Sequence, residues 1–352
     1  MRTLLAITSG VCVLVMAALL LASPRPAAAC AGLIGSNGAV NLGRTTTLAG
    51  YHEGVEHYVT AFQFQGGGGE FGTLIPLPGV PSKVERGGDW TLQRLVRETQ
   101  LLKFAAFGDA LAAAPQAEVL QQVQIDALDI TVLNGGGPDV ATWATDHGFR
   151  LSPDAPEVID FYARRSPIFL AAVFDGEAAA ARGQQIGDGT PVHITIPTSN
   201  PWVPLRILGL GKQPDDRVDA DVFLLTDSKP ALLPGPRVGL TLAHSEKATD
   251  SLLADLRSDA SGDWVPQSAW LTKLEVNSSA SDLHYDLAVD TTRAHRPSRV
   301  AAGLELPGPS LLKHDGSASP FVWVAVVGIL ALLIALFALR RQVNAGPHSP
   351  RA

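Results

Sequence analysis

"TTTLAGYHEGVEHYVTAFQF", residues 45–64, is the stretch that decides the fold. It contains two runs rich in β-prone residues, Thr45–Tyr51 and Glu56–Phe64. Between them lies the connection His52-Glu53-Gly54-Val55, which is the size of a turn and contains a glycine. Two such runs joined in this way are typical of a β-hairpin. We therefore expect a β-rich domain whose first part contains a hairpin.

The chain after this hairpin mixes further β-prone runs with helical patterns. Strands are expected at Gly72–Leu77, Val123–Leu133, Ile168–Phe174, Val192–Ile196, Pro204–Leu210, Ala220–Leu225, Gly239–Ala243, Trp270–Val276 and Leu283–Val289. Helices are expected at Asp89–Phe104, from a cap at Asp139 to near Gly148, at Pro156–Arg165 and at Ser245–Leu256. Residues 176–189 are small, polar and glycine-spaced, and form a candidate internal linker or long loop. The mixture predicts an α+β, sheet-rich domain with a few helices.

The N-terminal end of the chain resembles a targeting segment. Arg2 precedes an apolar run from Leu4 to Ala22, and Ala27-Ala28-Ala29 supplies a small-residue exit. This layout is typical of a secretory signal peptide, so residues 1–29 are expected to be removed.

A second apolar run lies near the C-terminus. Phe321–Leu339 contains no charged residue, and its 19 residues make a helix of roughly 28 Å, close to the thickness of a bilayer core. Arg340 and Arg341 follow at once, which places that end in the cytoplasm. The chain is therefore expected to be a single-pass protein of the cell membrane with its N-terminal domain outside.

These segments predict the organisation of the whole chain. We expect an extracytoplasmic domain at 30–300, a stalk at 301–320, a transmembrane helix at 321–339 and a short cytoplasmic tail at 340–352. Five of the 27 basic residues lie in the leader or tail, which leaves 22 against all 34 acidic residues, a net charge of −12 for the part between. A surface of that sign repels phosphate backbones, so nucleic acid is not an expected partner.

Cys30 allows four interpretations. Cys12 leaves with the leader, so the mature chain keeps at most one cysteine and has no intrachain disulfide. Lipidation needs a lipobox at the end of the apolar run, whereas the position three before Cys30 is Ala27 and lies beyond that run. A catalytic thiol needs a nearby group that lowers its pKa, and no His, Lys or Arg follows before Arg44. Ordinary cleavage beside Cys30 is favoured, although the exact cleavage site and any modification of Cys30 stay open.

The string "HEGVEH" is the one that most resembles a metal motif. A zinc protease motif places two histidines four residues apart on a helix, whereas His52 and His57 are five apart and flank a glycine. His52 and His57 remain candidate metal ligands across a hairpin, and a solvated hairpin end is the favoured alternative. "QGGGGEFG", "NGGGP" and "DDRVDAD" each lack a residue that a phosphate loop or an EF-hand needs, so no cofactor is expected.

A proline-rich step and three shorter segments carry a resemblance to a known family. "TLIPLPGVPSKV", residues 73–84, resembles a feature of the DUF2330 family, bacterial secreted or membrane-anchored proteins of unknown function. In that family a β-like segment ends in a Pro-x-Pro step with another proline shortly after, here Pro76, Pro78 and Pro81. We expect these prolines to shape a structural turn and to hold no ligand.

The shorter segments extend the resemblance along most of residues 30–290. "ACAG" at 29–32 is similar to the Ala-Cys-Gly-like start of family members with one alanine inserted, and "PLRILGL" at 204–210 and "DVFLLT" at 221–226 are similar to later segments. The resemblance implies no known activity, cofactor or catalytic residue.

Two classes of function follow from the sequence. The first is a binding or scaffolding module of the cell envelope, held by the C-terminal helix and directed at an unknown envelope protein or ligand. The second is an envelope-anchored hydrolase whose site is assembled from residues distant in sequence. The first is favoured because the chain has no Gly-x-Ser-x-Gly string and every other catalytic string fails at a required position. A pocket that holds a histidine beside a serine or carboxylate would favour the second.

Overall fold

The computed structural model describes residues 27–28, 32–35, 38–39, 44–63, 71–99, 119–181, 189–292, 294 and 296–307. Described residues up to Leu306 belong to one compact unit. Most of the expected leader, Cys30 and the expected transmembrane helix at 321–339 lie outside the described residues. Among the residues that are described, no helix has the length and apolar character needed to span a bilayer.

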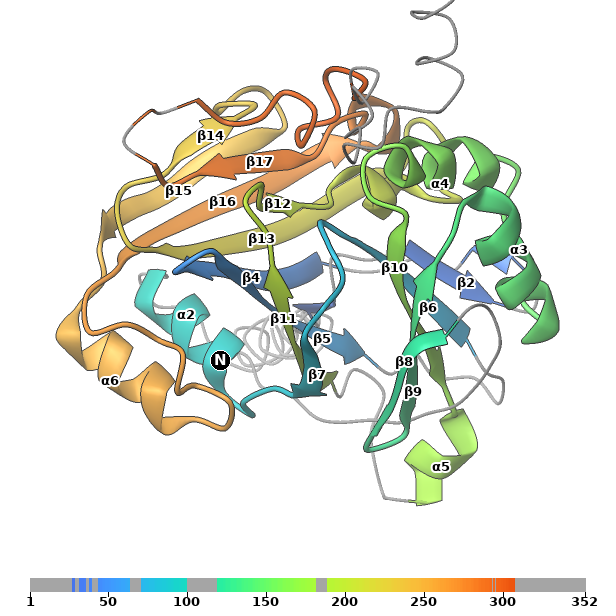
Figure 1. The fold of residues 1–352 in the computed structure, drawn as a ribbon, viewed down its shortest axis with the longest axis horizontal. Coiled ribbons are helices and arrows are strands. Elements are labelled where there is room, and N and C mark those ends of the chain that lie inside the picture. Colours follow the sequence, from blue (N-terminus) through green and yellow to red (C-terminus); the bar gives the residue numbers. More distant parts are fainter. Residues whose placement is uncertain are drawn as a thin grey trace, which may run out of the picture. The chain divides into compact units, whose positions relative to one another are not determined.

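The larger sheet is built around the predicted hairpin (Figure 1). Its strands follow the order β15 (Leu240–Lys247), β16 (Trp270–Ser279), β13 (Arg217–Thr226), β4 (Arg44–His52), β5 (Val55–Gln63), β11 (Gly189–Pro197) and β7 (Lys83–Arg86). Neighbouring strands are antiparallel except for β13 and β4, and the short strand β1 (Ala27–Ala28) pairs parallel with β4. The hairpin β4–β5 therefore lies near the middle of the sheet.

A second sheet and a small third one complete the β structure. The second has the antiparallel order β3 (Gly38–Ala39), β2 (Gly32–Gly35), β6 (Phe71–Leu77), β10 (Ile168–Phe174), β9 (Leu128–Asn134) and β8 (Val119–Ile125). The third consists of β12 (Trp202–Val203), β17 (Leu287–Asp290) and β14 (Ala231–Leu233).

The helices and the two large sheets pack in four layers, helices, sheet, sheet and helices. Residues 192, 194 and 196 of β11 and residues 168, 170 and 172 of β10 meet in the core between the two large sheets. The opposite face of the larger sheet packs against α2 (Thr91–Thr99) and α6 (Asp250–Ser258). The opposite face of the second sheet packs against α3 (Gly137–Asp146) and α4 (Ala155–Ala163). Because successive side chains point to opposite faces, each sheet buries both of its faces.

The hairpin expected from residues 45–64 is confirmed. His52 pairs with Val55 and Tyr51 with Glu56, so the turn consists of Glu53 and Gly54. Both turn residues have positive φ, 50° and 80°. Two positive φ values match the right-handed twist of the flanking strands, and glycine adopts them without steric cost.

Most of the other expected elements are present, several with shifted ends, and residues 100–104 of the expected helix 89–104 lie outside the described residues. The expected strand 123–133 is instead a hairpin, because Asp126, with φ 56°, turns the chain between β8 and β9. The start of the expected linker at 176–189 forms the helix α5 (Gly176–Ala181). The expected helix at 245–256 begins late, because β15 runs to Lys247 and Thr249 caps α6 by accepting a hydrogen bond from the Leu252 N–H. Asp139 does not cap α3 from outside but lies at its third residue, where its carboxylate accepts the Gly136 N–H.

One further expected strand is absent and another is shorter than expected. Residues 204–210 form no strand but the 3-10 turn η1 (Arg206–Gly209), because the N–H groups of Leu205 and Arg206 are bound by the side chain of Asp286. The expected strand 283–289 is reduced to β17, since the backbone N–H of Leu283 closes the preceding 3-10 turn η2 (Ala280–Asp282) and that of Asp286 donates to the carbonyl oxygen of Ala302.

Candidate functional site

Two histidines from neighbouring strands meet beneath the loop that follows α6. His57 of β5 lies opposite Thr195 of β11, and His193 lies opposite Val59. Both rings therefore point to the face of the sheet that α2 and α6 cover. His57 Nδ1 and His193 Nε2 are 2.9 Å apart, and His57 and His193 are 9% and 2% exposed. A contact of this length between two neutral imidazoles is one hydrogen bond, in which one nitrogen donates and the other accepts.

Trp264 covers this pair from the 259–265 loop. Its indole ring stacks on His57 with the ring centroids 4.2 Å apart and the planes 5° from parallel. Gly50, the residue of β4 paired with His57, makes room for the indole, since a Cβ at this position would lie 2.1 Å from Trp264 Cη2. We call His57, His193 and Trp264 the His–Trp cluster.

The other nitrogen of His193 faces a carboxylate and a small hollow. His193 Nδ1 lies 3.5 Å from Glu85 Oε1, which is longer than a good hydrogen bond. A cavity of about 10 Å³ adjoins His193 and is also lined by Thr91 and Ser261. That volume accommodates one water molecule, so the cavity has no room for a substrate while the loop is closed.

Burial keeps both imidazoles neutral near neutral pH. Burial is the largest cause that lowers the pKa of His57 to about 3, and the charge of His193 lowers it further. The pKa of His193 falls to about 4, again chiefly because of burial, while Glu85 acts in the opposite direction. An unpaired charge is costly in a site that water does not solvate, so each ring holds a single proton.

Glu56, the neighbour of His57 in the chain, points to the opposite face of the sheet and is fully buried. Burial raises the pKa of Glu56 to about 8, and a backbone hydrogen bond at Trp202 lowers it by less. The carboxyl group is therefore protonated at neutral pH.

The structure places the predicted metal candidates in different environments. His52 Nδ1 lies 2.6 Å from Asp227 Oδ1 near the end of the hairpin, whereas His57 binds His193. Within the described ranges, no group of three His, Cys, Asp or Glu residues is arranged to hold a metal ion. The sequence reasoning missed His193, because no pattern in "PVHITIP" indicates which strand will pair with it.

The three prolines lie at and after the end of β6. Pro76 is inside the strand, opposite Phe169 of β10, and the strand ends one residue later at Leu77. On its other side, the described pairing of β6 with β2 covers Phe71 to Leu74, so Pro76 lies outside that stretch. Pro78 and Pro81 lie in the connection between β6 and β7.

A larger hollow lies on the other side of the molecule, between α3 and α4. It has a volume of about 600 Å³. Its lining consists of Gly137, Pro138, Ala141, Pro156, Glu157, Asp160 and Arg164. We call it the α3–α4 groove. Most of these residues are apolar, and the charged ones come from α4 and from Arg164, which follows its last residue.

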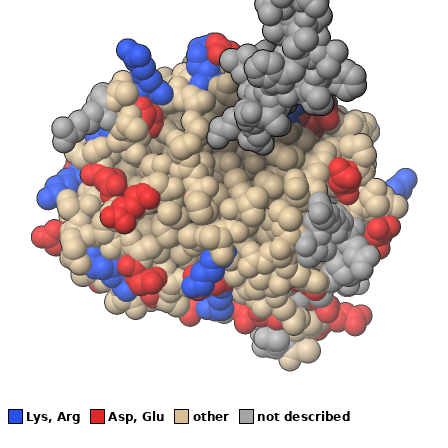
Figure 2. Space-filling model, viewed as in Figure 1, with Lys and Arg blue, Asp and Glu red and all other residues tan. Residues whose placement is uncertain are grey.

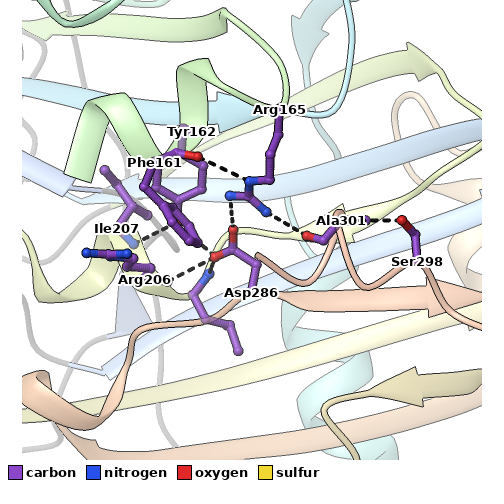
Figure 3. Close-up of polar contacts among 9 residues, drawn as sticks. Phe161, Tyr162, Arg165, Arg206, Ile207, Asp286, Ser298 and Ala301 are labelled. Atoms are coloured by element: carbon purple, nitrogen blue, oxygen red, sulfur yellow. Dashed lines mark hydrogen bonds and ion pairs between the residues drawn. The ribbon is translucent and has the colours of Figure 1, made fainter. Parts of the chain in front are cut away.

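The opposite face of α4 is fixed by a buried polar network (Figure 3). Arg165 Nη2 lies 2.5 Å from Asp286 Oδ2, and the Tyr162 hydroxyl donates to Asp286 Oδ1 at 2.8 Å. Arg165 Nη1 also donates to the carbonyl oxygen of Ala301 at 2.6 Å. Both ionic side chains are almost completely buried, at 4% and 0% exposure.

The same carboxylate also organises the η1 turn. Asp286 Oδ1 accepts the N–H groups of Leu205 and Arg206 at 2.7 and 3.1 Å, and the Tyr162 oxygen accepts the N–H of Ile207. One buried carboxylate therefore joins α4, η1 and the segment before β17, and so holds the helix that forms one wall of the α3–α4 groove.

A comparison with known protein families identifies the family of this chain. The model of an uncharacterised protein family conserved in bacteria, DUF2330, matches residues 24–288. The chain belongs to the DUF2330 family. The match covers the two large sheets, all the described helices and the His–Trp cluster, so these features lie within the DUF2330 region.

Comparison with solved structures gives distant similarities. A mutated baculovirus P35 after caspase cleavage matches at 11% identity with a TM-score of 0.39, covering 71% of this chain and 100% of that one. A second structure of a cleaved, mutated baculovirus P35 gives 9% identity and 0.38, with 72% and 99% covered. The caspase-8/P35 complex gives 11% and 0.37, with 70% and 96% covered. Scores this low do not establish a shared fold. A comparison with curated proteins finds no match.

Proposed function

We propose that this DUF2330 protein is a binding module of the bacterial cell envelope. In this proposal the domain lies outside the cytoplasmic membrane, is anchored by a helix at 321–339, and binds a segment of another envelope protein in the α3–α4 groove. The leader pattern at 1–29 and the charge-free run followed by Arg340 and Arg341 support the anchoring part.

The residues that line the α3–α4 groove support the proposal that it binds a peptide. Pro138, Ala141 and Pro156 offer an apolar lining. Glu157 and Asp160 add two carboxylates, which pair with Arg206 and Arg164 and which a basic ligand side chain would share or take over. Their side chains are 74% and 57% exposed, so a ligand can reach both. Apolar contact combined with accessible carboxylates suits an extended peptide that carries lysine or arginine among small apolar residues.

The network behind α4 favours binding in a second way. Because Tyr162, Arg165 and Asp286 fix the buried face of α4, the groove wall is held in place before a ligand arrives. Preorganisation of this kind lowers the conformational entropy that is lost on binding. The face shown in Figure 2 carries charges of both signs interspersed around its margin. The groove, with its shape and carboxylates, is therefore a more specific candidate for a binding site than the surface charge of this face.

The experiment uses the full chain in its own membrane. A photo-crosslinking amino acid at Ala141, inside the groove, is expected to yield one discrete adduct with another polypeptide. The same label at Thr241, an exposed residue of β15, serves as the matched control. Reversing the charges with Glu157→Lys and Asp160→Lys should reduce the adduct to the level of the control, with an unchanged circular dichroism spectrum. No adduct at Ala141 above that level, or an adduct unaffected by charge reversal, would contradict the proposed groove.

A hydrolase is the second candidate, because His193 and Ser261 border the same small cavity. Ser261 Oγ donates to the carbonyl oxygen of Arg86 at 2.7 Å, so this hydroxyl is engaged by the backbone in the closed loop. Hydrolysis of simple esters that is lost in Ser261→Ala and in His193→Gln would support this alternative over binding alone.

A further inference from the structure

The 259–265 loop, which contributes Trp264 to the His–Trp cluster, contacts three separate elements. The Asp259 carboxylate accepts the N–H of Trp90 at 3.1 Å and the hydroxyl of Thr91 at 2.8 Å, at the start of α2. Ser261 binds the backbone of β7 at Arg86. Trp264 stacks on His57 of β5. The 259–265 loop therefore holds the start of α2 against the sheet, and the histidine pair forms the floor under its indole.

The contact between the two histidines depends on their protonation. With both rings neutral, one hydrogen lies between His57 Nδ1 and His193 Nε2, and one ring supplies the lone pair. A first added proton leaves an N–H to donate but places a positive charge in a buried site. A second proton removes the last lone pair, so two N–H groups of like charge face each other at a separation of 2.9 Å. Electrostatic repulsion then opposes the closed arrangement.

We propose that His57, His193 and Trp264 form an acid-released latch. When both imidazoles take up protons, the indole of Trp264 leaves its stacked position on His57, and the 259–265 loop opens together with the start of α2. The opened site exposes two charged imidazoles and the apolar residues that line the cavity, among them Leu48, Val59 and Leu256. If the domain lies outside the membrane, as proposed above, the latch responds to the pH of the surroundings.

The charged groups around the cluster set the direction of the effect. Lys83 of β7 and His52 of β4 oppose protonation of the pair, whereas Glu85 of β7 and Asp263 of the loop favour it. At the start of α2, the Asp259 carboxylate binds Trp90 and Thr91 and joins the loop to that helix. Burial outweighs the attraction of the carboxylates, since the pKa of both histidines lies below the ordinary value of 6.5.

The sign of the pH dependence follows from these values. Below pH 6.5 an open state with solvated imidazoles binds more protons than the closed state. Acidification therefore favours opening, starting below pH 6.5 and complete by about pH 3, where the closed state is protonated as well.

Fluorine NMR of the full chain labelled with fluorotryptophan follows the latch directly. The Trp264 resonance is assigned by its loss in Trp264→Phe. In the wild type this resonance is expected to leave its closed position between pH 6.5 and about 4, while that of the buried Trp202 stays unchanged. In the double variant His57→Gln, His193→Gln, which cannot take up these protons, the Trp264 resonance should not move in that range.

A control variant and a substitute for the double variant complete the experiment. His284→Gln removes an exposed histidine elsewhere and should leave the wild-type response intact. If the double variant does not fold, the single variant His193→Gln is used, and its transition is expected to shift or disappear. A Trp264 resonance that moves only together with that of Trp202 would indicate global unfolding and overturn the latch. An identical transition in wild type and in a folded histidine variant would also overturn it.

Discussion

At the residue scale, Gly50 decides whether the His–Trp cluster can close. This glycine has no positive φ and is not needed for a turn; its value is the absence of a side chain beneath Trp264. An alanine methyl group at this position would meet the far edge of a stacked indole, which cannot bend out of its own plane. The indole or the strand must therefore move.

We predict that Gly50→Ala destabilises the fold by about 1–3 kcal/mol, the usual cost of an overpacked core. Urea unfolding followed by circular dichroism measures the change. Gly235→Ala is the matched control, because nothing lies within 4 Å of a Cβ at Gly235. Equal stabilities of Gly50→Ala and the wild type would show that the Trp264 indole does not pack against Gly50.

Glu56 provides a second prediction at the residue scale. Its folded pKa of about 8 lies above the ordinary value of 4.5, so between these values the folded protein holds a proton that the unfolded chain releases. The group's contribution to stability is complete below pH 4.5 and is lost as pH rises toward about 8, with a slope of up to about 1.4 kcal/mol per pH unit. Glutamine keeps the shape without the titration.

Glu56→Gln should therefore gain stability relative to the wild type as pH rises from 4.5 to 8. Chemical unfolding at the two ends of this range gives the difference. Glu53→Gln, at the exposed turn, should show no such trend. The burial argument fails if the stability difference between Glu56→Gln and wild type is the same at both pH values.

At the scale of elements, one carboxylate converts an expected strand into a turn. Residues 204–210 have a β-prone sequence, yet Asp286 takes the N–H groups of Leu205 and Arg206 that a strand would have offered to a neighbour. The same carboxylate neutralises Arg165 of the α4 region. The conformation of η1 is thus set by a residue about 80 positions away.

Asp286→Ala should destabilise the fold by about 3–5 kcal/mol, because it leaves the Arg165 charge buried without its partner. It should also increase amide hydrogen exchange at Leu205 and Arg206, whose N–H groups lose the carboxylate that accepts them. Asp160→Ala, which breaks the exposed pair with Arg164, is expected to cost less than about 1 kcal/mol. Comparable losses in the two variants would mean that the network does not hold α4.

At the scale of the whole molecule, the organisation of the chain remains a prediction from the sequence. A protease added to intact spheroplasts should degrade the domain before residue 307 and spare a tag placed after Ala352. Truncation before Pro320 should release the domain from the membrane, since the apolar run at 321–339 is the expected anchor. Loss of the tag would refute the orientation, and firm retention of the truncated chain would indicate a second anchor, most simply lipid on Cys30.

The sequence predicted many of the local elements for a clear reason. Turn chemistry and side-chain periodicity act within a few residues, so the hairpin at Glu53-Gly54 and the strand β10 were found close to their observed limits. The proline-rich step likewise indicated family membership, which the match to residues 24–288 confirms. The expectations that were wrong, the strand at 204–210 and the helix start at 245–247, depend on partners elsewhere in the chain.

By itself, the sequence determined the sheet-rich α+β class, the central hairpin and the family, because these depend on local patterns. The tertiary structure decided the sites. His57 meets His193 across 136 positions, and Arg165 meets Asp286 across 121. Strand register and layer packing bring such residues together, and their burial then sets their protonation and charge. Neither register nor burial is encoded within the few residues that surround each side chain, so the histidine pair and the buried network became visible when the strands were paired.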